Sequence, residues 1–211
     1  MRIVCISDTH NQHRDLDIPK GDVLIHAGDA TYQGLSHEVE DFLNWFAGQP
    51  HPFKILVAGN HDWLFQRHPM MARQLLDAHM GVITYLQDSG CEIGGLKVWG
   101  SPWQPTFCDW AFNLPRKGQA LCEVWNRIPM DTDVLVTHGP AYGILDQVMH
   151  MPAGGWDPTH GEPDHLGCEE LRIRIRTVKP RLHVFGHIHG GYGIHKDKPD
   201  YRLTSAKTRS F

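Results

Sequence analysis

The sequence predicts an α/β fold, in which short buried strands alternate with helices. Five apolar runs are short, partly β-branched and bounded by turn residues, as buried strands usually are. They span residues 3–7, 23–28, 55–59, 134–137 and 182–186. Segments with apolar residues at helical spacing lie between several of these runs. This alternation of the two periodicities is the pattern of an α/β protein.

The connecting segments carry signals of their own. A helix is expected after Ser36, a candidate N-cap, with apolar residues at helical spacing up to Phe46 and an end at Gly48. Further helices are expected at residues 69–79, at about 117–127 and from about 168 to 179. Two β-like segments flank Gly94-Gly95, which predicts a hairpin of residues 91–93 and 96–99. A last strand is expected at residues 201–204.

Each of the five apolar runs leads into residues that commonly bind metals. Two of the runs are followed by ligand residues at alternate positions, which share one side of an extended chain. In α/β sheets, ligands bind beyond the carboxyl ends of the strands, so these side chains should converge. The sequence therefore predicts a metal site built from two Asp, one Asn and four His: Asp8, His10, Asp29, Asn60, His138, His187 and His189.

These residues, with their neighbours, resemble the calcineurin-like metallophosphoesterase superfamily. Its pattern is D-x-H, G-D, G-N-H-[DE], H and G-H-x-H, and no position of it is missing here: Asp8-Thr9-His10, Gly28-Asp29, Gly59-Asn60-His61-Asp62, His138 and Gly186-His187-Ile188-His189. Segments such as Gly100-Ser101-Pro102-Trp103 and Gly167-Cys168-Glu169-Glu170-Leu171 are similar to the branch of metallophosphoesterase-domain-containing proteins and its bacterial relatives. The resemblance implies two packed mixed sheets flanked by helices, an αββα sandwich.

The resemblance also implies roles for the residues. Asp29 would bridge two divalent ions; Asp8, His10 and His189 would complete the first metal site, and Asn60, His138 and His187 the second. Some animal members have Gly at this position, which weakens metal binding. This chain has His187 there, so its second metal site is expected to be intact. With no thiolate in the set, manganese, iron, cobalt, nickel and zinc remain open as the metal. His61 is the expected acid catalyst, with Asp62 orienting its ring; the alternative is that His61 only supports its neighbours.

Composition narrows the class of protein. The chain has 211 residues, 41% of them hydrophobic, and the expected ligands span residues 8 to 189, so 1–211 is read as a single domain. No run approaches the roughly 20 apolar residues of a membrane span. Five cysteines without C-x-x-C spacing suggest reduced thiols in a cytoplasmic protein. A net charge of −4 without a basic run argues against long nucleic acid as a partner. The oligomeric state stays open, with a homodimer among the alternatives.

The expected function is that of a binuclear metal-dependent phosphodiesterase, acting on small phosphodiesters by attack of a metal-bound hydroxide. The resemblance puts 2′,3′-cyclic nucleotides first among the substrates. A phosphomonoesterase or pyrophosphohydrolase on the same site, and a metal-binding scaffold without turnover, are the alternatives; a nuclease subunit is disfavoured by charge.

Two segments could shape substrate choice. One is an aromatic cluster, with base stacking or core packing as its role: Trp99, Trp103, Phe107, Trp110 and Phe112. The other is a long loop at 149–165, where His160 or His165 could contact phosphate.

Overall fold

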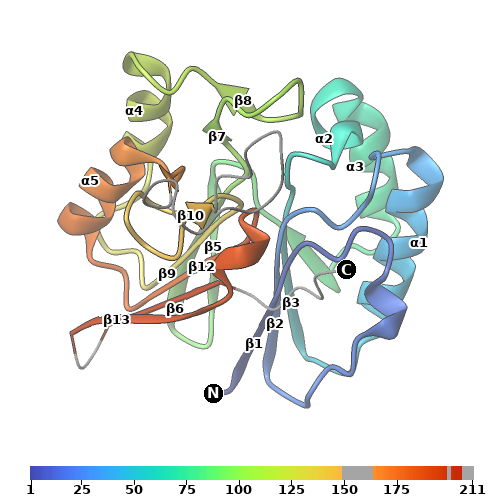
Figure 1. The fold of residues 1–211 in the computed structure, drawn as a ribbon. Helices are drawn as coiled ribbons and strands as arrows, with labels where there is room; N and C mark the ends of the chain where they lie inside the picture. Colours follow the sequence, from blue (N-terminus) through green and yellow to red (C-terminus); the bar gives the residue numbers. More distant parts are fainter. Residues whose placement is uncertain (149–163, 199–200, 206–211) are drawn as a thin grey trace.

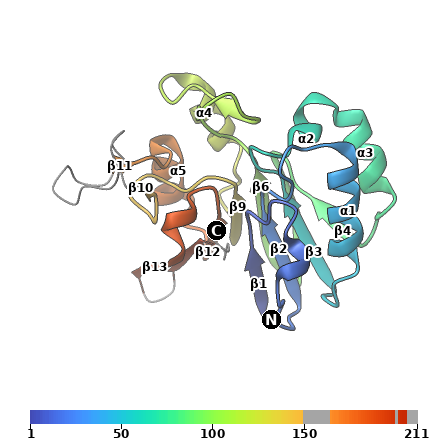
Figure 2. The same cartoon turned by 45° about the vertical axis from the view of Figure 1, so that its right-hand side comes forward.

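Two β-sheets pack face to face, and helices cover the outer face of each. The computed structural model describes residues 1–148, 164–198 and 201–205. Helices α1 to α3 lie on one side of the sandwich, and α4 and α5 lie on the other (Figure 1). A view turned by 45° shows the two sheets between these helical layers (Figure 2). The α/β sandwich expected from the sequence is confirmed.

The first sheet is entirely parallel. Its order is β1-β2-β3-β4, with the bounds Ile3–Ile6, Val23–Ala27, Phe53–Val57 and Ile83–Tyr85. Three helices belong to this half of the molecule: α1 (Ser36–Ala47), α2 (Trp63–Arg67) and α3 (Pro69–Asp77). Because all four strands run the same way, their carboxyl ends share one edge of the sheet.

The second sheet is mixed, with the order β13-β14-β12-β9-β6-β5. Its four inner strands are parallel: β14 (Tyr201–Ser205), β12 (Leu182–Phe185), β9 (Val134–Thr137) and β6 (Leu96–Ser101). The antiparallel edge strands are β13 (Gly193–Lys198) and β5 (Ser89–Ile93). Helices α4 (Gln119–Asn126) and α5 (Glu169–Val178) cover it. Short elements complete the described part of the chain: η1 (His13–Asp15), β7 (Gln104–Pro105), β8 (Asn113–Leu114), β10 (Gln147–Val148), β11 (Asp164–His165) and η2 (His189–Gly191).

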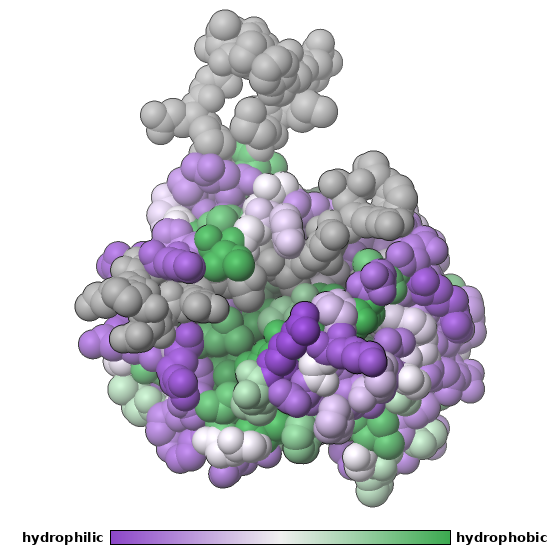
Figure 3. Space-filling model, turned by 90° about the horizontal axis from the view of Figure 1, so that it is seen from below, coloured by the Kyte–Doolittle hydropathy of each residue, from purple (hydrophilic) through white to green (hydrophobic). Residues whose placement is uncertain are grey.

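Alternation along the strands divides the core into layers. In β2, Val23 and Ile25 face the space between the sheets, whereas Leu24 faces the helices on the outer side. In the second sheet, Leu135 and Phe185 likewise face outward and pack against α4 and α5. Seen from below, apolar surface gathers in the middle of the face where the chain begins (Figure 3). The seam between the sheets opens there, lined by Met1, Ile3, Val23, Ile25, Ile55, Ile93, Leu96, Val98 and Val134.

Most predicted elements are confirmed, with corrections at their ends. The hairpin forms around Gly94 and Gly95, both at positive φ, and the last strand is β14. The N-cap of α1 is Leu35 rather than Ser36, because the Glu38 carboxylate accepts the Leu35 N–H at 2.9 Å. Helix α4 begins only after Gly118, whose φ of 111° is not helical. The short elements α2 and β4 were not predicted.

None of the helices in the described ranges has the length and apolarity that crossing a membrane would need.

Candidate metal centre

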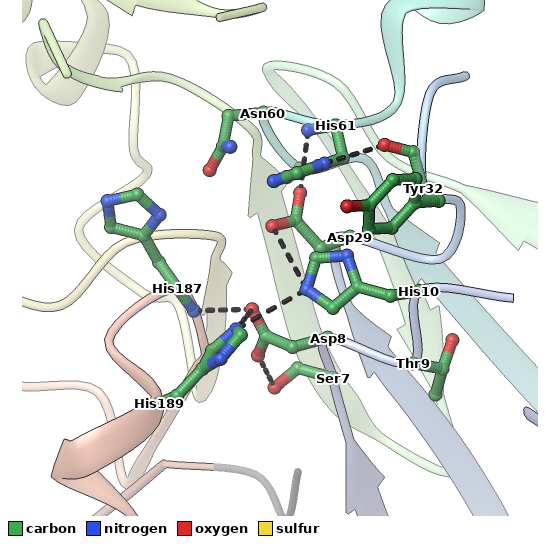
Figure 4. A network of polar contacts seen from close by, with 12 residues as sticks. Ser7, Asp8, Thr9, His10, Asp29, Tyr32, Asn60, His61, His187 and His189 are labelled. Carbon is green, nitrogen blue, oxygen red and sulfur yellow. Dashed lines mark hydrogen bonds and ion pairs between the residues drawn. The ribbon is translucent and has the colours of Figure 1, made fainter. Parts of the chain in front are cut away.

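The strand ends of the two sheets meet at one place, and Figure 4 shows the side chains gathered there. Asp8 follows β1 and Asp29 follows β2, whereas His187 comes from the loop after β12 in the other sheet. Backbone contacts hold these loops together: Asp8 N–H donates to the Gly28 carbonyl at 2.8 Å, and His187 N–H donates to Asp8 Oδ1 at 2.8 Å. The second contact joins the two sheets directly at the site.

One group of potential ligands lies around His10. Its Nε2 is 3.3 Å from His189 Nε2 and 3.8 Å from Asp29 Oδ2, and His189 Nε2 is 3.6 Å from Asp8 Oδ1. Asp8, His10 and His189 offer ligand atoms within 4.8 Å of one another. Asp8, His10 and His189 therefore lie close enough together to hold one ion, and Asp29 approaches the same group through Oδ2.

A second group lies on the other side of Asp29. His138 Nε2 is 3.4 Å from Asp29 Oδ1 and 2.8 Å from Asn60 Oδ1. Asp29, His138 and His187 again offer ligand atoms within 4.8 Å of one another. The other ring nitrogen of His138, Nδ1, lies 3.0 Å from the Ala27 carbonyl. Such an outer contact favours the tautomer in which Nε2 could bind a metal.

The donor set fits divalent cations. Asp8 and Asp29 are buried, and among the described residues neither forms an ion pair with a lysine or arginine. The Nδ1 atom of His10 is also buried without a hydrogen-bond partner there. Buried carboxylates need a counter-charge, and histidine and carboxylate ligands are those that borderline divalent ions take. The seven predicted side chains could hold such ions: Asp8, His10, Asp29, Asn60, His138, His187 and His189. His61 also offers a ligand atom within 4.8 Å of those of His10 and Asp29.

The centre keeps its carboxylates ionised. Burial alone would raise the pKa of Asp8, but the hydrogen bond to His189 and the charge of His138 bring the pKa below its usual value. The pKa of Asp29 is lowered too, with His138 again overcoming the effect of burial. Burial opposes protonation of His138 as well, yet Asp29 raises its pKa to about 9. In His187, burial and the neighbouring His138 lower the pKa to about 4. The site therefore couples two negative charges to a cluster of imidazoles.

Backbone conformation at the strand ends is unusual. Asp8, Asp29 and His187 have φ of 51°, 55° and 70°, in the left-handed region that residues with a side chain rarely enter. Each such residue costs about 1–3 kcal/mol, and such costs gather at functional sites. The turns aim the side chains into the space between the sheets (Figure 4).

His61 sits at the edge of the same space. Its Nδ1 lies 2.7 Å from the Tyr32 carbonyl, and its backbone N–H donates to Asp29 Oδ1 at 2.8 Å. The Trp110 ring stacks on the His61 ring, with 4.0 Å between centroids and 29° between planes. His10 approaches edge-on at 4.6 Å. The ring is thus fixed on several sides, and its other nitrogen points into the site (Figure 4).

The expected contact between Asp62 and the His61 ring is not formed, and the orienting role predicted for Asp62 is wrong. The buried Asp62 carboxylate instead accepts hydrogen bonds from Gly59 N–H at 2.7 Å, and from Thr31 N–H and Oγ1 at 2.9 and 2.7 Å. It ties the loop after β2 to the loop after β3. The acceptor for the His61 ring is a main-chain carbonyl, which carries no signal in the sequence.

The aromatic cluster divides into two parts. Phe112 is buried, and Trp99 and Trp103 pack against the core. Trp110 stacks on His61, and the exposed Phe107 lies edge-on to His187 with 5.5 Å between centroids. These last two rings therefore border the centre. Tyr32, whose carbonyl holds His61, was missed by sequence reasoning.

The predicted long loop lies mostly outside the described residues, and so does His160. His165 is described: its Nδ1 is 2.5 Å from Oδ1 of the buried Asp146. That carboxylate also accepts the N–H groups of Gly143 and Gly167 at 2.9 and 3.0 Å. His165 thus fastens the base of the loop.

Comparisons with known proteins agree with this geometry. The sequence model of the calcineurin-like phosphoesterases matches residues 1–191. Metallophosphoesterase domain-containing protein 1 of Homo sapiens is 43% identical over 216 residues, which cover 93% of this chain and 63% of the human protein. The chain thus spans less than two thirds of that relative's length.

Solved structures share the fold at low identity. A protein of Thermus thermophilus superposes with a TM-score of 0.65 at 15% identity, covering 97% of this chain and 88% of the other. The phosphopantetheinyl hydrolase of Mycobacterium tuberculosis gives 0.57 at 16% identity, covering 97% and 88%. With its family pattern, its ligand groups and its human relative, the chain belongs to the family of calcineurin-like phosphoesterases.

Proposed function

We propose that this protein is a binuclear metal-dependent phosphodiesterase for small phosphodiesters, with 2′,3′-cyclic nucleotides as the first candidates. One observation carries the proposal. The two carboxylate oxygens of Asp29 face different groups: Oδ2 lies 3.8 Å from His10 Nε2, and Oδ1 lies 3.4 Å from His138 Nε2. A carboxylate that divides its oxygens between two ligand groups is what a bridge between two ions requires.

Two bound divalent ions would activate water and offset the charge that develops on the phosphate. The proposed ligands add only the two carboxylate charges of Asp8 and Asp29, so the loaded centre stays cationic and suits an anionic substrate. In this proposal Asp8, His10 and His189 hold one ion, and Asn60, His138 and His187 hold the other. Manganese, iron, cobalt, nickel and zinc all suit this donor set.

We assign the proton donor to His61. Its Nδ1–H donates to the Tyr32 carbonyl, which leaves Nε2 to carry the proton that the leaving oxygen needs. The stacked Trp110 and the edge of His10 keep the ring from turning away. Asp62 takes part only by holding the loop that bears His61 and Asn60.

Two alternatives use the same residues. A phosphomonoesterase or pyrophosphohydrolase would need the same ions but accept a dianionic phosphate. A metal-binding scaffold would bind the ions without turnover. The presence of every expected ligand, with His61 in reach of the centre, favours an enzyme over a scaffold.

The proposal is tested with purified protein, reconstituted in turn with each of the five metals and offered mono-, di- and cyclic phosphates. We expect turnover of diesters, with cyclic nucleotides above linear ones. Turnover of monoesters alone would instead identify the protein as a phosphomonoesterase. Tight metal binding without turnover of any ester would identify a scaffold.

We further propose that residues 1–211 act as one domain, because both sheets contribute to the centre. All five cysteines are free, which supports the proposed cytoplasmic location.

A further inference from the structure

A large cavity opens beside the metal centre, on the side of the second sheet. It has a volume of about 660 Å³, and His187 and His189 form part of its wall. Pockets of several hundred Å³ are the size that holds an organic ligand rather than a lone phosphate. A phosphoester bound at the centre would therefore extend its organic group into this space.

Most of the wall is apolar. Six separate segments line the cavity, and three of the lining side chains are exposed although they are large and hydrophobic: Phe107, Val148 and Leu166. Pro105, Pro140 and Ile188 add to the same surface. An apolar group that covers this surface would gain a free energy of about 25 cal/mol for each Å² of apolar surface removed from water.

Arg116 is the one side chain among the described lining residues that is always charged. Its Nη1 donates to the Gly167 carbonyl and to Glu169 Oε2, both at 2.8 Å, and its Nη2 donates to the Leu166 carbonyl at 2.6 Å. These contacts use three of the five N–H groups of a guanidinium. Among the described residues, one Nη2 hydrogen and the Nε hydrogen have no partner, and the side chain is 33% exposed.

Glu169 compensates this charge only in part. Its side chain is 47% exposed, so water screens the pair. The backbone carbonyls fix the plane of the guanidinium, and a fixed fork with two remaining hydrogens is suited to an anion.

We propose that this cavity holds the organic group of the substrate and selects phosphoesters whose apolar group ends in a second anion, a carboxylate or a phosphate, bound by Arg116. The inference rests on the proposed function, because it places the first phosphate at the metal centre. It narrows the substrate class from small diesters in general to those that carry a distal negative charge. A 2′,3′-cyclic nucleotide belongs to this class only if it bears a further phosphate.

The test uses phosphonates, which bind like phosphate esters but have no ester oxygen to leave. The probes are ω-carboxyalkylphosphonates of increasing chain length, n-alkylphosphonates of the same lengths, and α,ω-alkanediphosphonates. Each is titrated calorimetrically into the metal-reconstituted full chain and also measured as a competitive inhibitor. We expect one chain length at which the probe with a distal anion binds better than the n-alkylphosphonate of the same length. The better of the two series with a distal anion distinguishes a carboxylate from a phosphate.

Variants of Arg116 and of Glu169 should change the preference for a distal anion in opposite directions. Arg116→Gln should reduce that preference roughly tenfold to a hundredfold, the range for a lost charge-assisted hydrogen bond. Arg116→Lys keeps the positive charge but not the planar fork of donors, so this variant should lose part of the preference. Glu169→Gln removes the competing carboxylate and should strengthen the preference a few-fold; a guanidinium with only a structural role would give no gain.

Arg174→Gln is the matched control, since Arg174 also donates to main-chain carbonyls, those of Asn126 and Ile128, but does not line the cavity. It should keep the preference. The inference is overturned if no chain length favours the probes with a distal anion, or if their advantage persists in Arg116→Gln. Diester turnover that continues in either case would leave the proposed function standing.

Discussion

At the scale of single residues, His61 owes its orientation to a main-chain carbonyl and to the face of Trp110. If it protonates the leaving oxygen, its loss should matter in proportion to the basicity of that oxygen. We expect His61→Ala to slow a cyclic nucleotide far more than an activated nitrophenyl diester, with a loss of about 10²–10⁴-fold on the basic leaving group.

Initial rates on both substrates, together with metal analysis, measure this prediction. The metal content should stay that of the parent protein. Equal losses on the two substrates would mean that His61 only binds or positions the phosphate.

Asp62 should behave differently, because its carboxylate binds loop donors and not the ring. Asp62→Asn replaces one acceptor oxygen with an amide that faces Gly59 N–H or Thr31. Leaving a buried donor unpaired costs about 1–3 kcal/mol of unfolding free energy. We expect lower stability in urea melts and similar fractional losses on both ester substrates. A loss confined to the basic leaving group would restore the orienting role predicted from the sequence.

Residue identities could be predicted at the site wherever a side chain itself supplies the chemistry. Asp8, Asp29 and His138 each follow a strand, so the sequence pattern predicted a ligand role for them. The residues that hold His61 and its loop in place could not be predicted. Tyr32 contributes a main-chain carbonyl, which every residue has, and Asp62 acts through contacts with a distant loop. The partners of a side chain depend on which loops meet in space.

At the scale of elements, glycines let the strand ends approach. A Cβ on Gly186, after β12, would lie 2.2 Å from Asp8 Oδ2 and 2.5 Å from Ser7 Oγ, both across the junction of the sheets. Gly186→Ala should therefore displace Asp8, empty the first metal site and cost about 1–3 kcal/mol of stability.

Metal stoichiometry and thermal melting test this against Gly48→Ala, where the added Cβ makes only ordinary contacts at 3.4 and 3.5 Å. The Gly48 variant should keep its metal. A Gly186 variant with full metal content would show that the two sheets have freedom to separate at the site.

Elements with a clear period could be predicted, and those too short to show one could not. Helix α5 runs from the Cys168 N-cap to Val178, close to the expected range, because its apolar positions recur over three turns. Helix α2 has five residues and strand β4 has three, too few for a period to appear. The strand order of the second sheet rests on pairings between distant segments. The family resemblance implied mixed sheets but no order, and the first sheet is in fact entirely parallel.

At the scale of the whole molecule, each sheet buries one histidine that stays neutral. Burial lowers the pKa of both His26, in β2, and His183, in β12, to about 3. In the unfolded chain these rings titrate near 6.5. Between pH 6.5 and 3 the unfolded state therefore binds more protons, and stability is lost as the pH falls.

His183→Leu should flatten this loss by up to about 1.4 kcal/mol per pH unit, the contribution of one proton. Urea melts of metal-free protein at several pH values between 6.5 and 4 measure the slope. The same slope in parent and variant would mean that His183 is protonated within the fold.

In the proposed centre, Asp29 joins two ions across the meeting edges of the sheets. The metal content of Asp29→Ala, compared with that of His187→Ala, tests this bridge, provided that each variant is folded and reconstituted as the parent is. We expect two ions per chain in the parent, one retained in His187→Ala, and loss at both positions with no turnover in Asp29→Ala. Two ions per chain in the Asp29 variant would contradict the bridge and, with it, the binuclear centre proposed here.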